Sequence, residues 1–206
     1  MCTIIRMAGK LNFHENAPDP ARHPREVALD GEPPQIVRTF GFVDLIGFTT
    51  YCDVAGPGNA QIALRSFRKL IRRICSQRGV RVSRWLGDGA MLVGVELGDV
   101  VACTLDIVSR MQDGPLGVRG GVSTGPALLL DGDDYTGRAV NLASRLCDIA
   151  EAGTVYIDGD SKTGIPVWAL YEICDTLDVK GLGLREDIGK LTLLDPSGVA
   201  AWNLGI

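Results

Sequence analysis

The sequence has few histidines, no paired cysteines and no long apolar run, the features on which zinc clusters and membrane spans depend. Only two histidines, His14 and His23, occur in its 206 residues, and the six cysteines are scattered without a CxxC pair. A zinc cluster is therefore not expected, and in a reducing compartment the cysteines should be free thiols, most of them small core residues. No apolar run approaches the roughly 20 residues that cross a bilayer.

The sequence also lacks an excess of positive charge and a secretion signal. Its net charge of −4 and pI near 5.2 argue against a polyanion-binding surface, so nucleic acid is not expected as a partner. The first 20 residues contain no signal-peptide apolar region. Hydrophobic residues at 46% and charged residues at 22% are typical of a globular protein, which we expect to be cytoplasmic.

Residues 1–35 differ in composition from the rest of the chain. They hold both histidines and five of the ten prolines, within polar, turn-rich segments. We expect an extended arm or linker here, with a short strand at "CTIIRM", and a folded domain over residues 36–206. A dimer-wrapping arm or the remnant of a regulatory segment is the alternative for these residues.

From Ile36 onward, strand-like and helix-like segments alternate. We expect strands at 35–45, 80–86, 90–97, 116–130 and 154–158, helices at 56–79, 99–114 and 137–153, and two strands around a loop in 171–194. The arginines of the first helix, Arg68 and Arg72 among them, lie off its apolar face and are expected to face solvent. The order β-α-β-β-α-β, followed by α-β and extra strands, predicts an α+β fold: a ferredoxin-like core with C-terminal additions.

Two carboxylates lie at turns beside buried strands, Asp44 in "FVDLIGFT" and Asp88 in "WLGDGAM". In the predicted order the first strand and the hairpin are neighbours in the sheet, so the two side chains can converge. Close carboxylates share a proton or bind cations, and hard oxygen ligands suit Mg²⁺ that also coordinates phosphates. Gly47 leaves backbone N–H groups free to face a phosphate. Taken singly, each aspartate is also explained as a turn or cap residue.

The third predicted helix carries a second polar group. Asn141 and Arg145 are four residues apart, so they project from one helix face, and Asp134 precedes the same helix. An amide and a guanidinium on one face suit a centre where phosphoryl charge accumulates. Alone, the pair is equally typical of a solvated helix surface.

Five motifs together resemble the catalytic domain of class III nucleotidyl cyclases, in order and in spacing. They are "FVDLIGFT", "RWLGDGAMLVG", "GVRGGVSTG", "DYTGRAVNLASRL" and "VKG", and the resemblance spans residues 36–195. It implies that Asp44 and Asp88 bind two divalent cations, Mg²⁺ or Mn²⁺. It further implies that the backbone of Leu45, Ile46, Gly47, Phe48 and Thr49 contacts a triphosphate.

The resemblance assigns the remaining polar residues to the nucleotide. Lys180 matches the lysine that holds the end of the triphosphate, and Asn141 the residue that orients the ribose. Arg145 matches the arginine that stabilises the transition state at the α-phosphate. Asp134 matches the aspartate that accepts a hydrogen bond from the adenine amino group. In this family one subunit supplies the metal aspartates and the other the base-reading and transition-state residues. Because this chain carries both sets, a head-to-tail homodimer with two equivalent sites is implied.

One position departs from the adenylate cyclase pattern. Arg84 stands where those enzymes carry a base-reading lysine. A donor at position 84 and an acceptor at 134 still match adenine, whereas guanine would reverse both, so ATP is the expected substrate. Since arginine is longer and planar, low activity, relaxed ATP/GTP choice or a purely regulatory nucleotide-binding domain are the alternatives. Trp85 beside it either packs on the base or belongs to the core.

Overall fold

The computed structural model describes residues 26–27, 35–112, 114–130 and 134–193. The predicted arm and its "CTIIRM" strand lie outside the described residues, except that Glu26–Val27 forms β1 and pairs antiparallel with the start of β2. The division of the chain at residue 36 stays a prediction. Among the described residues, no helix combines the length and the apolar character that crossing a membrane requires.

The elements follow the expected order. The core consists of β2 (Gln35–Ile46), α1 (Phe48–Gln77), β3 (Arg81–Leu86), β4 (Gly89–Gly94), α2 (Leu97–Arg110) and β5 (Gly117–Leu130). The additions are β6 (Asp134–Thr136), α3 (Arg138–Ile149), β7 (Val155–Asp158), η1 (Gly159–Gly164), β8 (Ala169–Ile173), β9 (Leu177–Val179), β10 (Gly183–Arg185) and β11 (Ile188–Leu193).

The main sheet has the ferredoxin-like strand order. Its path is β3-β4-β2-β5-β7-β11-β8; the first four strands pair antiparallel with one another, and β5 pairs parallel with β7. The expected α+β class is therefore confirmed. The tail adds β8 and β11 to the sheet as predicted, and the connection between them forms a separate two-stranded sheet of β9 and β10.

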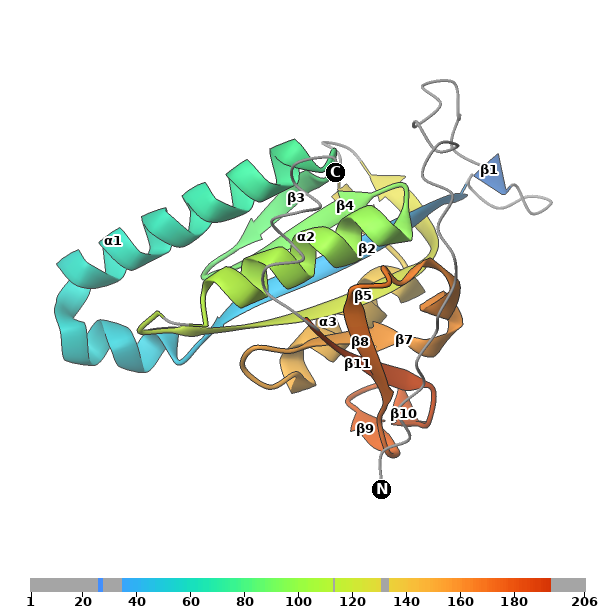
Figure 1. Cartoon of the computed structure of the whole chain (residues 1–206). Coiled ribbons are helices and arrows are strands. Elements are labelled where there is room, and N and C mark those ends of the chain that lie inside the picture. Colours follow the sequence, from blue (N-terminus) through green and yellow to red (C-terminus); the bar gives the residue numbers. More distant parts are fainter. Residues whose placement is uncertain (1–25, 28–34, 113, 131–133, 194–206) are drawn as a thin grey trace.

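Helices cover both faces of the sheet. α1 and α2 lie on one face and α3 on the other (Figure 1). The α1/α2 face holds the larger apolar core, with Phe67, Ile71 and Leu105 among its buried members. Trp85 packs against this core, on the face of the sheet opposite the pocket that Arg84 lines, which favours the core role for this ring.

Glycine lets α3 come unusually close to the sheet. A Cβ at Gly121 of β5 would lie 2.2 Å from the carbonyl oxygen of Ala143 and 2.3 Å from the amide nitrogen of Cys147. Both clashes are with backbone, which cannot move aside without displacing the helix. The absence of a side chain at Gly121 therefore fixes how near α3 lies to β2 and β5.

The first helix begins earlier than expected. Gly47, with φ of 75°, ends β2, and the helix starts at Phe48 rather than at residue 56. Gly56 interrupts it with non-helical angles (φ 79°, ψ 161°) and Pro57 follows. The Gly-Pro pair, a normal helix-start signal, here marks a kink between two helical segments.

Replacing Gly121 with alanine should destabilise the fold by about 3 kcal/mol, because overpacking against backbone cannot be relieved by a side-chain rotation. Urea unfolding measures the change. Gly58→Ala is the matched control: it lies in α1 with no atom within 4 Å of the new Cβ, and should be neutral or stabilising. Equal stability of the two variants would contradict the close approach of α3.

Candidate functional site

The sequence-predicted aspartates Asp44 and Asp88 lie side by side at one end of the central strands. Asp44 is directly opposite Gly89 of β4, and Asp88 is the residue before Gly89 in the β3–β4 turn. Burial raises the pKa of Asp44, the hydrogen bond from Arg119 opposes that rise, and the charge of Asp88 adds to it. The two carboxylates therefore repel each other, and a cation bound between them would relieve that repulsion.

Asp44 has a cationic partner that sequence reasoning missed. It is opposite Arg119 of β5, whose Nη2 donates to its Oδ2 at 2.9 Å and whose Nε donates at 3.3 Å. Arg119 also donates to the backbone carbonyl oxygen of Asp148 on α3. An arginine inside the glycine-rich segment "GVRGGV" was the available signal, because so polar a side chain is rare in a central strand.

A pocket of about 370 Å³ lies beside the aspartates, on the α3 face of the sheet. Its lining includes three sequence-predicted residues, Arg84, Asp134 and Asn141. A smaller pocket of about 150 Å³ contains Asp44 and Asp148 and shares Leu86 and Ser144 with the first. The structure thus places the predicted base-reading residues, Arg84 and Asp134, in one pocket and the predicted metal ligand Asp44 in an adjoining pocket.

Arg84 and Asp134 meet inside the larger pocket. Arg84 Nη2 donates to Asp134 Oδ2, although the two residues are 50 apart in sequence. The other carboxylate oxygen, Asp134 Oδ1, is buried and has no hydrogen-bond partner among the described residues. Asp134 Oδ1 is therefore available to accept a hydrogen bond from a ligand in the pocket.

Two predicted residues, Arg145 and Lys180, lie outside both pockets. Arg145 forms an ion pair with Asp148 one turn further along α3, at 3.3 Å, and is 44% exposed. Lys180 is exposed in the turn between β9 and β10. Neither cation lines the pocket that contains Asp44, although Asp148, the partner of Arg145, does.

The segment from residue 45 to 49, where β2 ends and α1 begins, offers backbone rather than side chains. The side chain of Leu45 is buried in the core and that of Phe48 packs against it. Gly47 is exposed, and its carbonyl oxygen accepts the first hydrogen bond of α1 from Tyr51 at 2.9 Å. The N–H groups at this helix start have no partner within the helix, so they are available to an anion.

Comparison with known proteins points to one group of folds. No protein-family model matches the chain. The catalytic core of a rhodopsin-guanylyl cyclase with converted specificity, in complex with ATPαS, superposes with a TM-score of 0.68 at 23% identity, over 76% of this chain and 96% of that chain. The adenylyl cyclase CyaB of P. aeruginosa superposes with a TM-score of 0.64 at 22% identity, over 76% and 93%.

The chain has the fold of a class III nucleotidyl cyclase catalytic domain. The resemblance seen in the motifs is confirmed. An adenylate cyclase of Glutamicibacter nicotianae is 30% identical to this cyclase-like chain over 130 residues, 62% of this chain and 32% of that protein. An uncharacterized protein of Mycobacterium tuberculosis is 31% identical over 130 residues, 62% and 34%. The match spans about a third of the length of these relatives.

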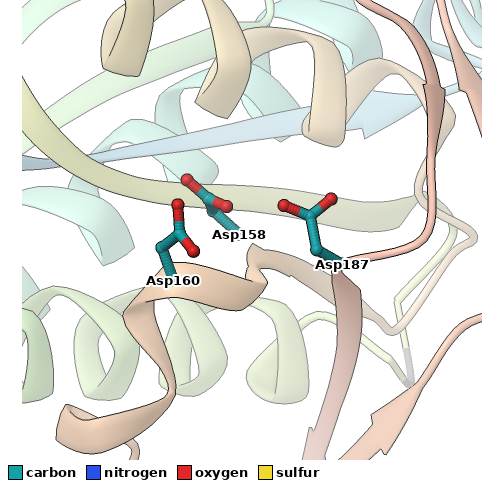
Figure 2. A group of neighbouring side chains, drawn as sticks. All are labelled: Asp158, Asp160 and Asp187. Atoms are coloured by element: carbon teal, nitrogen blue, oxygen red, sulfur yellow. The ribbon is translucent and has the colours of Figure 1, made fainter.

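A second acidic cluster in the cyclase fold lies apart from Asp44 and Asp88. One oxygen from each of Asp158, Asp160 and Asp187 lies within 4.8 Å of the others (Figure 2). Such a group can hold a metal ion, but a guanidinium already contacts it. Arg185 donates from Nε to Asp187 at 2.7 Å, and its Nη2 lies 3.7 Å from Asp158. We interpret the cluster as an internal ion-pair network that joins β7 to the start of β11.

Arg185→Met should lower the free energy of unfolding by about 1–3 kcal/mol, because it leaves the buried Asp158 and its neighbours without their cation. Lys190→Met is the control: Lys190 pairs with Glu151, which is 70% exposed, and should cost less than about 1 kcal/mol. Urea unfolding distinguishes the two. If Mn²⁺ stabilised the wild type and this effect were lost in Asp160→Asn, the cluster would be a metal site instead.

Proposed function

We propose that the chain is an adenylate cyclase that converts ATP to 3′,5′-cyclic AMP and pyrophosphate, at sites shared between two copies. One observation carries the proposal. The adjacent carboxylates Asp44 and Asp88 lie next to a pocket whose polar lining includes Arg84, Asp134 and Asn141. Acidic ligands for a cation and groups suited to a nucleoside are thus found on one face of a cyclase fold.

The residues at Asp44 fit a divalent cation. Both bonds from Arg119 go to Oδ2 of this carboxylate, and the negative charge of Asp88 lies beside it. A Cβ at Gly89 would lie 3.0 Å from Asp44 Oδ1, so glycine keeps the approach to this oxygen open. Two divalent cations held by Asp44 and Asp88 would supply acidification of the ribose 3′-hydroxyl and neutralisation of phosphate charge.

Base choice follows from the polarity of Arg84 and Asp134. Adenine presents an acceptor at N1 and a donor at its amino group, which matches a guanidinium donor and the unused Asp134 Oδ1 acceptor. Guanine would set its O6 against the carboxylate and its N1–H against the guanidinium. Mismatches between buried polar groups can cost up to about 10⁴ in discrimination, so ATP is the favoured substrate.

The reaction needs few groups beyond those that position the substrate. The 3′-oxygen attacks the α-phosphorus in line, the bond to the bridging oxygen breaks, and pyrophosphate leaves with that electron pair. Asn141 orients the ribose and Arg145 balances charge on the transferring group. Lys180 and the backbone of residues 45–49 hold the leaving phosphates. The hydroxyl proton passes to solvent or substrate.

A second copy of the chain would complete each site, in which the metal aspartates of one copy meet the base-reading residues and Arg145 of the other. Arg145 and Lys180 lie on the surface outside both hollows, where a partner can present them across an interface. Leu86 and Leu130, which line the larger pocket, are 41% and 46% exposed. A head-to-tail homodimer would cover this apolar rim and form two equivalent sites.

A regulatory nucleotide-binding domain is the second candidate. The Arg84–Asp134 ion pair favours it, because the pair must open before Arg84 reaches a base. The solved structures similar to this chain also include the guanylate cyclase domain of RhGC from Catenaria anguillulae in complex with GTP, so GTP turnover is tested alongside ATP.

Asp44→Ala and Arg145→Ala should each lose at least about 10²-fold in cyclic AMP formation, because a ligand or a charge-stabilising group is removed. An equal mixture of the two should recover about a quarter of the wild-type rate, since half of the dimers regain one of their two sites. Mixing Asp44→Ala with Asp88→Ala, which damage the same half-site, should recover nothing. A mixture as inactive as its parents would contradict the shared site.

Arg84→Lys should raise kcat/KM for ATP several-fold while preserving the preference for ATP over GTP. Lysine keeps the donor but loses the planar fork that suits a carboxylate, so the contact with Asp134 opens more readily. Product formation from ATP and from GTP with Mn²⁺ measures both effects. No turnover by either protein, with nucleotide still bound, would instead support the regulatory candidate.

A further inference from the structure

The turn that carries Asp88 is held from the opposite face of the sheet. Arg68, in the middle of α1, donates from Nη2 to the carbonyl oxygen of Gly87 at 2.7 Å. This carbonyl belongs to the peptide group that joins Gly87 to Asp88. A bond to it therefore fixes the orientation of the backbone from which the Asp88 carboxylate projects.

The turn itself is short, and side-chain packing does not hold its glycine. Leu86 pairs with Gly89, so only Gly87 and Asp88 connect β3 to β4, and β3 is the edge strand of the sheet. Gly87 has φ of 63°, and a Cβ added there would meet no heavy atom within 4 Å, so packing does not restrict this residue. Glycine in open space has wide backbone freedom, and Asp88 would share that freedom.

Arg68 is itself oriented by an aromatic ring. Its guanidinium carbon lies 5.1 Å from the ring centroid of Trp85, which packs against the apolar core on the α1 face. Cation–π stacking on a half-buried indole limits the positions of the guanidinium. Arg72, one turn later, stacks on the same ring at 4.9 Å but makes no bond to the turn. The helix thus offers two arginines in similar surroundings, of which one reaches Gly87.

We propose that Arg68 is a positioning residue for Asp88, acting through the Gly87 carbonyl and not by touching substrate. The inference rests on the proposed function, in which Asp88 is a metal ligand. It predicts that loss of the Arg68 bond weakens metal binding while the nucleotide pocket, on the other face of the sheet, keeps its affinity. Arginines on the outside of α1 would otherwise be assigned to a solvated surface.

The test compares Arg68→Met with Arg72→Met in the full chain. Both keep an aliphatic side chain on Trp85, and only the first removes the donor to Gly87. Mn²⁺ binding is measured by electron paramagnetic resonance with a non-cleavable ATP analogue present, together with the Mn²⁺ dependence of cyclic AMP formation. Arg68→Met should raise the half-saturating Mn²⁺ concentration about tenfold in both measurements, in line with losing a charged hydrogen bond. Arg72→Met should leave it within about twofold.

Two further measurements separate positioning from general destabilisation. The KM for ATP at saturating Mn²⁺ and the melting temperature should change no more in Arg68→Met than in Arg72→Met. Arg68→Lys should recover part of the loss, because an ammonium donates to a carbonyl but does not stack as a plane. Equal Mn²⁺ affinities for the two methionine variants overturn the inference.

Asp88→Asn distinguishes this failure from failure of the proposed function. If Asp88→Asn abolishes Mn²⁺ binding but Arg68→Met does not weaken it, only the role of Arg68 is wrong. If Asp88→Asn leaves Mn²⁺ binding unchanged, Asp88 is not a metal ligand, and the two-metal site and the role of Arg68 are both overturned.

Discussion

The candidate site depends on the position of Asp44, near the end of β2. Its carboxylate lies between two neighbouring strands and is half-buried. β2 is central, so Asp44 has β4 on one side and β5 on the other, and their register brings Gly89 and Arg119 opposite it. Burial there raises the pKa of Asp44 and makes an unpaired charge costly. Arg119 offsets that cost in the free chain, and a bound cation would replace it in the proposed enzyme.

The position of α3 depends on the same strands. Gly121 lets the helix backbone come close to β5, and this closeness brings Asn141 and Ser144 over the pocket beside Asp44. A larger residue at Gly121 would push α3 away from the sheet and would displace the pocket wall that α3 forms. The lack of a side chain at Gly121 therefore affects both the packing of α3 on the sheet and the geometry of the candidate site.

The strand and helix order was predictable because strong periodicity and glycine turns mark most elements. The start of α1 was not, since the Gly56–Pro57 pair has the features of a helix start and in the fold is a kink. The approach of Asp44 to Asp88 followed from strand order alone. By contrast, the Arg84–Asp134 contact and the Arg119–Asp44 pair depend on side-chain reach across strands. The motifs contain these residues but do not specify which of them pair.

Successive side chains of β2 point to opposite faces of the sheet, so the residues that stabilise the core and the carboxylate of the candidate site lie on different faces. Val43 and Leu45 enter the core under α1 and α2, while Asp44 between them faces α3. A register shift of one residue would bury the carboxylate in that core, so the apolar pattern that stabilises the fold also fixes the direction of the site. The β3–β4 turn is where the two faces meet. Its backbone bonds to Arg68 from the α1 side while its carboxylate lies beside Asp44, so α1 acts on the site without lining it.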